Sequence, residues 1–277
     1  MKWSLIILGD VKNLFYGILL GVSNIIPGVS AGTVAVILGI YNTLINSISG
    51  ILKNFKVNFR FLFFIGIGVL IGIIGLSNIM DNLLEKYPWQ MSYLFMGLIA
   101  GSIVILFKEA MSFKPKKIHF VYFLITFLIL VGMKFINPST DVVIISELNL
   151  KTILILVLSG FLASSSMILP GISGSFVLVL LGIYNSIISA VSHFQIKILI
   201  PFGVGVVLGF VVMVKLIEYM LKKFKVQSYM AILGLVVGSI VSIFPGFEFS
   251  SIGISCIITF IFGFLISLFL CRFNSKN

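Results

Sequence analysis

The sequence predicts an all-α polytopic membrane protein made of two inverted-topology repeats, each a re-entrant helical hairpin plus three transmembrane helices, with both termini cytoplasmic. Three observations predict this class: the composition, an internal repeat and the distribution of charge. Of the 277 residues, 60% are hydrophobic and 10% are charged, and the mean hydropathy is +1.24. Apolar runs of roughly 17–22 residues recur along the chain, which is the helix length that a ~30 Å hydrocarbon core requires.

Two segments of the chain repeat each other. Residues 17–49 and 160–192 align without a gap at an offset of 143, with 16 identities in 33 positions. Each copy carries Pro-Gly-x-Ser inside a long apolar stretch and then Leu-Gly-Ile-Tyr-Asn. Paired, interrupted apolar segments in the two halves of a membrane protein are the best sequence indication of a transport site.

The repeat extends beyond these segments. Residues 64–72 match 201–209 at an offset of 137, and at the same offset Gly97-x-x-x-Gly101 matches Gly234-x-x-x-Gly238. The chain therefore divides into halves at 1–145 and 146–277 that together form one transport domain. In each half we expect one broken hairpin followed by three plain spans, at 13–50, 61–79, 91–107 and 119–136, and then at 151–192, 198–217, 229–244 and 252–271.

Loop charge orients these segments, because cytoplasmic loops of membrane proteins are enriched in lysine and arginine. If the N-terminus is inside and each hairpin returns to the side it entered, 14 of the 19 basic residues lie in inside loops. Acidic residues then gather outside, at Asp81, Glu85, Asp141, Glu147 and Glu248. One hairpin and three spans reverse the side of the membrane, so the second half is expected to be inverted relative to the first.

The rival topology has each broken segment cross the membrane once. It would place the loops with Lys53–Arg60 and Lys108–Lys117 outside, against the charge rule, and we reject it. Two full spans would have the same parity as a hairpin. The first limb, residues 13–26, favours the re-entrant form because 14 residues give a helix only about 21 Å long.

The Pro-Gly-x-Ser turns predict an anion site. Proline ends a helical limb, glycine permits a tight reversal, and Ser30 and Ser173 fit as N-caps of the following limbs. A new helix begins with unpaired N–H groups and a partial positive charge, so two such starts facing each other would suit a phosphate. A turn between packed helices is the structural alternative. The candidate phosphate-binding residues are Asn24, Gly28, Ser30, Gly32, Thr33, Gly171, Ser173, Gly174 and Ser175.

Other residues are less specific candidates. Tyr41 and Tyr184 could line a polar path or anchor the helices at the interface. Asp81 and Glu218 are equivalent in the repeat and could titrate during transport, although charges solvated at span ends are the simpler interpretation. The four Gly-x-x-x-Gly pairs indicate close helix packing.

Several functional classes are excluded by the sequence. It has no Walker A motif, no H-E-x-x-H, no G-x-S-x-G and no Cys/His metal spacing, so we expect no enzyme activity, cofactor, metal or nucleotide. The net charge of +11 is explained by loop lysines rather than by nucleic-acid binding. Cys256 and Cys271 share one apolar segment and are expected to be packing residues.

The two motifs resemble the PopT family of bacterial polyprenyl-phosphate transporters over nearly the whole chain. The resemblance is most specific at residues 24–33 with 39–41 and at 168–175 with 182–184. Ala31 stands where the family usually has the first glycine of Ser-Gly-Gly-Thr, which puts a strained backbone at that position in doubt. The resemblance implies transport of undecaprenyl phosphate from the outer to the inner leaflet of the bacterial cytoplasmic membrane, which recycles the lipid carrier of cell-envelope synthesis, with the two hairpins as the head-group site.

An energetic argument adds an expectation about coupling. Moving an anion inward against an inside-negative potential costs about 2.3 kcal/mol per charge per 100 mV, so we expect a proton or cation to travel with the lipid. The partner is then a polyprenyl-phosphate lipid, and a homo-oligomer is left open. The alternative function is secondary transport of a small soluble anion or ion by the same paired hairpins.

Overall fold

The computed structural model describes residues 2–25, 29–135, 149–247 and 249–274, and all regular structure in these ranges is helical. The first half contains α1 (Lys2–Ile25), α2 (Ala31–Ile37), α3 (Tyr41–Ser49), α4 (Phe55–Lys86), α5 (Pro88–Ser112), a short 3-10 helix (Lys117–His119) and α6 (Phe120–Lys134). The second half contains α7 (Leu150–Ile168), α8 (Gly174–Leu180), α9 (Tyr184–Ser192), α10 (Ile196–Lys223), α11 (Lys225–Ile243) and α12 (Ser251–Asn274).

Seven of these helices are long and apolar enough to cross a membrane, or up to nine if each bent pair described next is counted as one span. The chain is therefore a multi-pass membrane protein. The plain spans expected from the sequence each fall mainly on one helix, except that the span at 119–136 begins in the 3-10 helix, continues through α6 and ends outside the described residues. The loop residues Asp141, Glu147, Glu248 and Lys276, which contribute to the charge argument, lie outside the described residues.

The two repeated segments are broken twice, and the sequence analysis identified only the first break. The second break separates α2 from α3 and α8 from α9, where the helix axes bend by 120° and 116°. Gly39 (φ +66°) and Gly182 (φ +70°) occupy the left-handed region there, which costs little only for glycine. The repeated Leu-Gly-Ile-Tyr motif therefore encodes a helix break.

The first limb is also longer than expected. It is part of α1, which begins at Lys2 rather than at residue 13 and runs for 24 residues. At ~1.5 Å per residue such a helix is about 36 Å long, but it includes Asp10 and Lys12 and is not among the helices apolar enough to span a membrane, so the re-entrant form stays a prediction. The short, bent parts of each repeat are instead the pairs α2–α3 and α8–α9, which are called the first and second broken segments below.

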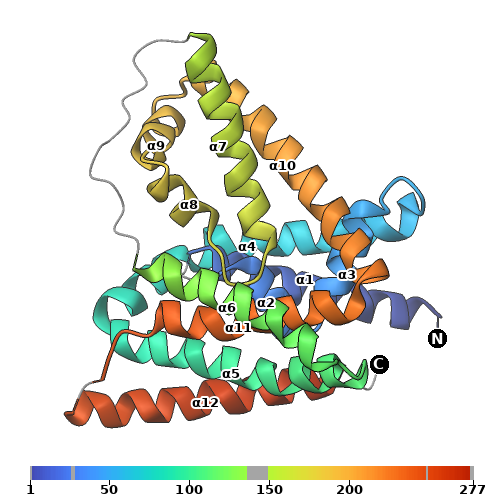
Figure 1. Ribbon diagram of the computed structural model, residues 1–277, viewed down its shortest axis with the longest axis vertical. Helices are drawn as coiled ribbons and strands as arrows, with labels where there is room; N and C mark the ends of the chain where they lie inside the picture. The colour runs from blue at the N-terminus through green and yellow to red at the C-terminus, as the bar shows by residue number, and fades with distance from the viewer. Residues whose placement is uncertain (1, 26–28, 136–148, 248, 275–277) are drawn as a thin grey trace.

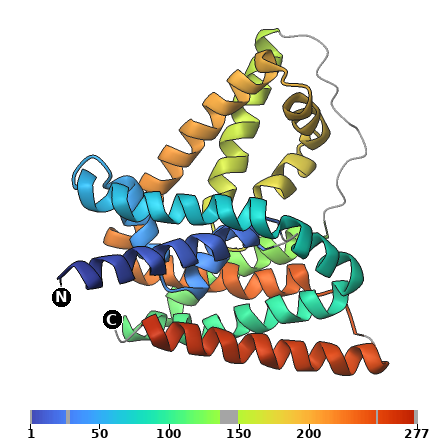
Figure 2. The same cartoon turned by 180° about the vertical axis from the view of Figure 1, so that it is seen from behind.

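The helices pack in an order that follows the repeat. Helix α1 packs along α4, and α7 along α10, within each half. The last helix of each half packs instead on the other half, α6 along α11 and α12 along α5, and α5 contacts α11 at the centre. Figures 1 and 2 show α7–α10 projecting as a group from the rest of the molecule.

The four Gly-x-x-x-Gly pairs lie at the contacts α1–α4, α7–α10, α6–α11 and α5–α12, in agreement with the close packing that the sequence predicted. A Cβ atom at Gly97 would lie 2.0 Å from the Phe260 carbonyl oxygen, and one at Gly234 would lie 2.3 Å from the Phe123 carbonyl oxygen. Corresponding contacts hold α4 on α1 and α10 on α7, where added Cβ atoms at Gly68 and Gly205 would also meet backbone. Close approach of helix backbones is how small residues promote association in membranes.

Adding one methyl group at the α5–α12 contact should destabilise the protein. Because the obstacle is backbone rather than a flexible side chain, we expect Gly97→Ala to cost about 1–3 kcal/mol. Thermal unfolding of the detergent-purified protein measures this. Gly132→Ala is the matched control, since nothing lies within 4 Å of its added Cβ; equal melting temperatures of the two variants would contradict the packing role.

Candidate functional site

The turns of the two halves meet at the centre of the molecule. The backbone N–H of Gly171 donates to the Ser30 hydroxyl at 2.9 Å and to the Thr33 hydroxyl at 2.7 Å. Both hydroxyl-bearing residues are buried, with Ser30 5% and Thr33 0% exposed. Residues 141 and 138 positions apart in sequence thus share hydrogen bonds, which place Gly171 of the second turn against the start of α2.

Ser30 begins α2 as predicted. Its backbone is extended, and its side-chain oxygen accepts from the Thr33 N–H at 3.1 Å. The two hydroxyls are also 2.9 Å apart, so that one of them donates to the other. Ala31 is the first residue of α2 in an ordinary helical conformation, so this position does not require glycine.

The second turn differs from the first. Ser173 lies at the N-cap position of α8, but its side chain makes no capping hydrogen bond, so the predicted side-chain cap is wrong here. Its hydroxyl instead lies 2.7 Å from the Ser175 hydroxyl, in a more exposed position than Ser30. Gly171 has φ +85°, in agreement with the predicted tight reversal.

The two predicted ligand-facing glycines are in contact with protein. A Cβ at Gly32 would lie 2.9 Å from the Ile168 carbonyl oxygen and 3.1 Å from the Pro170 nitrogen, so Gly32 lets the second turn approach α2. A Cβ at Gly174 would meet Met167 and Ala163 of α7. In this structure the glycines make room for backbone packing at the turns rather than for an open cleft.

The remaining candidates of the first half are Asn24, Gly28, Asp81 and Tyr41. The Asn24 amide donates to the Leu20 carbonyl within its own helix, at 3.0 Å. Gly28, with Pro27, lies outside the described residues. Asp81 is exposed near the end of α4, where its neighbour Met80 packs in the same apolar cluster as Val29 of the first turn. Tyr41 is buried, and its hydroxyl donates to the Ile168 carbonyl at 3.3 Å, at the end of α7.

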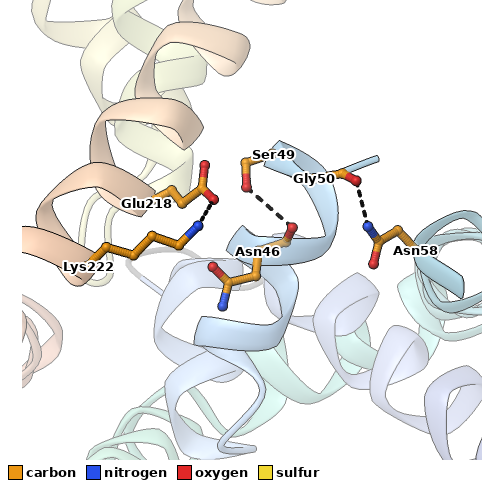
Figure 3. A network of polar contacts seen from close by, with 6 residues as sticks. All are labelled: Asn46, Ser49, Gly50, Asn58, Glu218 and Lys222. Carbon is orange, nitrogen blue, oxygen red and sulfur yellow. Dashed lines mark hydrogen bonds and ion pairs between the residues drawn. The ribbon is translucent and has the colours of Figure 1, made fainter. Parts of the chain in front are cut away.

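On the second half, Tyr184 is half-buried against the small apolar cluster of α7–α10. Glu218 forms an ion pair with Lys222 on the same helix. Figure 3 shows the Glu218 carboxylate facing the Ser49 hydroxyl at the end of α3. In the same region the Asn58 amide donates to the Gly50 carbonyl at 2.7 Å, which ties the end of α3 to α4.

One polar cluster was missed by the sequence analysis. The Asn42 amide donates to the Tyr229 hydroxyl at 2.6 Å, and that hydroxyl donates to the Glu109 carboxylate at 2.6 Å. These residues lie on α3, α5 and α11. An acid at the end of an apolar span was the available signal, because ionisable residues within such spans are uncommon and often functional.

The fold and these turns define a helical membrane transporter: broken helices meet between two repeats, and the surrounding helices are apolar enough to span a bilayer. The sequence model of the family described as undecaprenyl phosphate translocase-like matches residues 20–257, so the chain belongs to that family. The resemblance to polyprenyl-phosphate transporters noted from the motifs is confirmed.

Two curated relatives carry the same description. A polyprenyl-phosphate transporter of Staphylococcus aureus is 37% identical over 96% of this chain and 97% of its own length. One of Vibrio cholerae is 32% identical over 83% of this chain and 76% of its own. Both are named as transporters, in agreement with a non-catalytic membrane protein, and no solved structure matches the chain significantly.

Removing the two hydroxyl acceptors of Gly171 should destabilise the fold. The double variant Ser30→Ala/Thr33→Val leaves a buried N–H without a partner, which costs about 1–3 kcal/mol. Chemical denaturation in detergent measures the loss. The matched control is Ser173→Ala/Ser175→Ala, whose exposed hydroxyls bond each other, and we expect little change there. A control as destabilised as the double variant would contradict this account.

Proposed function

We propose that the protein translocates undecaprenyl phosphate from the outer to the inner leaflet of the bacterial cytoplasmic membrane and so recycles this carrier for cell-envelope synthesis. Membership of the translocase-like family supports the lipid class. The observation that carries the proposal is the meeting of the two turns, at which Gly171 is bonded to Ser30 and Thr33. The direction of transport follows from the need to return the carrier inward.

The phosphate site in this proposal consists of backbone and hydroxyl donors. Among the described residues, the buried side chains with polar groups are serines, one threonine and tyrosines such as Tyr41 and Tyr229, with no charged side chain. The N–H of Gly171 and the hydroxyls of Ser30 and Thr33 already form one hydrogen-bonded group, and Ser173 and Ser175 add two hydroxyls that are more exposed. A phosphate that enters between the turns would exchange these protein–protein hydrogen bonds for bonds to its own oxygens.

A neutral site offsets part of the cost of moving a charged head group. An unpaired ion in a low-dielectric core costs tens of kcal/mol by Born estimates, and several donors aimed at one anion reduce this penalty. The polyprenyl tail can stay in the lipid throughout, so only the phosphate needs a polar route. The proposed ligands are those predicted from the sequence, among them Asn24, in the last turn of α1, and Gly28, which lies outside the described residues.

The site proposal is tested by lipid movement in proteoliposomes. We expect Ser30→Ala/Ser173→Ala, which removes one hydroxyl from each turn, to lower the transfer of a phosphate lipid between leaflets by about tenfold or more, the factor for one hydrogen bond to a charged ligand. Ser112→Ala/Ser189→Ala removes two exposed hydroxyls elsewhere and serves as the control. Undiminished transfer would rule out the paired turns as the head-group site.

The same preparation separates the lipid from a small soluble anion. Inorganic phosphate is supplied outside the vesicles in place of the lipid. Uptake of free phosphate without lipid transfer would favour the alternative function, because a soluble-substrate carrier need not accept a lipid tail.

Coupling to an ion is part of the proposal. Inward movement of the anion works against the membrane potential, and we expect co-movement of a proton or cation, with Asp81 and Glu218 as the first acids to replace. Lipid transfer is measured with an imposed pH gradient and then with an imposed potential. If transfer responds to neither gradient, the coupling part of the proposal fails while the lipid substrate stands.

A further inference from the structure

The two broken segments have similar sequences but unequal surroundings. The first belongs to the large core of the molecule, in which Ala35, Leu38 and Ile45 are buried together with residues of α5, α10 and α11. The second belongs to a separate, smaller cluster made only with its own α7 and α10, through Leu178, Ile183 and Ile187 among others. Two copies of one sequence element therefore occupy different environments in the same structure.

Polar contacts show the same inequality. The first segment is tied to both halves, because Tyr41 bonds the end of α7 and Asn42 bonds Tyr229 of α11, which in turn bonds Glu109 of α5. In the second segment, Tyr184 is half-buried and Asn185 is exposed, although they are the repeat equivalents of Tyr41 and Asn42.

Tyr229 is the centre of the contact on the first segment. It is only 6% exposed, and the ring of Phe113 packs on it with 5.0 Å between ring centroids. A cavity of about 50 Å³ adjoins it, lined by Gly39 at the break between α2 and α3 as well as by Asn42 and Glu109. Tyr229, a residue of α11, is thus held against the end of α5 by Phe113 and Glu109, and its hydroxyl accepts from Asn42 of the first broken segment.

The second half has no counterpart of this contact. When the alignment at an offset of 137 is continued, Ser92 corresponds to Tyr229, and Gly246 corresponds to Glu109. The Ser92 hydroxyl is short and bonds the Pro88 carbonyl of its own helix at 2.9 Å. A docked second segment could not form the bond from amide to phenol to carboxylate that holds the first.

A second contact of the first segment does have a counterpart. Ser49 at the end of α3 faces Glu218 of α10 (Figure 3), and the equivalent residues in the repeat are Ser192 and Asp81. In this structure α9 packs mainly on α8 and α10, and both Ser192 and Asp81 are exposed. Proximity of positions 49 and 218 therefore indicates that the first broken segment is docked, and proximity of positions 192 and 81 indicates that the second one is.

We propose that Glu109 and Tyr229 are positioning residues that hold the first broken segment against α5 and α11, and that the two segments dock alternately during transport. Hydrogen bonds to a carboxylate are stronger than those between neutral groups, and only the first segment has one through Tyr229. The bond therefore biases the protein toward the arrangement with the first segment docked. The inference concerns the transport cycle of the proposed function, but its test needs no lipid substrate.

The test compares two engineered disulfides in the full-length protein, with Cys256→Ala and Cys271→Ser as background. Ser49→Cys/Glu218→Cys reports the first segment docked, and Ser192→Cys/Asp81→Cys reports the opposite arrangement. We expect Tyr229→Phe and Glu109→Gln each to raise the ratio of the second cross-link to the first about tenfold, the factor for losing one hydrogen bond to a charged group. Asn42→Ala, which breaks the contact at its other end, is expected to shift the ratio in the same direction.

Tyr93→Phe is the matched control. Its hydroxyl bonds the Gly246 carbonyl at 2.8 Å, at the end of the α5–α11 pair opposite Glu109 and Tyr229, and makes no bond to the first segment among the described hydrogen bonds, so the ratio should stay unchanged. If the variants at 229, 109 and 42 elute as folded protein and all leave the ratio unchanged, the positioning role is overturned. If the pair at 192 and 81 never cross-links in any background, alternate docking is overturned, whatever the lipid assay gives.

Discussion

The hydrogen bonds from the Gly171 N–H to Ser30 and Thr33 are the interaction on which the arrangement of the two halves depends. A helix that breaks inside a membrane must find partners for the backbone groups it exposes, because lipid offers none. Here the first turn supplies hydroxyl acceptors, and the second turn supplies the donor. The two halves therefore meet at their turns. Each turn follows a long helix, α1 or α7, whose position is held by packing on α4 or α10.

The glycine contacts complete this arrangement in a way that couples the halves. Because α6 packs along α11 and α12 packs along α5, each half closes the other, and neither can keep its packed surface alone. Lipid tails provide no hydrophobic drive for helix association, so backbone approach at the glycines has to supply contact energy. The helices α5, α6, α11 and α12 make a common frame, on which the first broken segment is packed in the main core while the second, in the described residues, packs only with α7 and α10 of its own half. Movement of the second broken segment is thus compatible with an intact frame.

Much of this could be predicted from the sequence, and for identifiable reasons. Composition gave the helical membrane class, and the chemistry of Pro-Gly-x-Ser located the first break and the Ser30 cap, since these effects are local. The spacing of Gly97 and Gly101 predicted close packing, but it could not show that the partner helix comes from the other half. The break at Gly39 was missed because a glycine inside an apolar run also fits a continuous packed helix, and only the left-handed backbone distinguishes the two.

The contact of Asn42, Tyr229 and Glu109 was missed for a different reason. It joins three helices whose mutual positions depend on tertiary packing, and no spacing in the sequence brings position 42 to position 229. The capping role of Ser173 was overestimated because the repeat was taken to imply equal geometry. The two segments have similar sequences but unequal contacts, because each one packs on different neighbouring helices. Among the described residues, the second segment therefore lacks the contacts with α5 and α11 that the first one makes.

The chemistry of the proposed phosphate site fits a transporter better than a tight binder. A phosphate held by lysines inside the membrane would be bound strongly but also released slowly, because separating paired charges in a low-dielectric medium is costly. In the described residues the buried side chains with polar groups are serines, a threonine and tyrosines such as Tyr41 and Tyr229, and the charged residues are half-buried or exposed. Neutral donors that already satisfy one another can exchange partners with an entering phosphate and recover them when it leaves. A site of this kind can bind from one side and release to the other, which strong ionic binding would oppose.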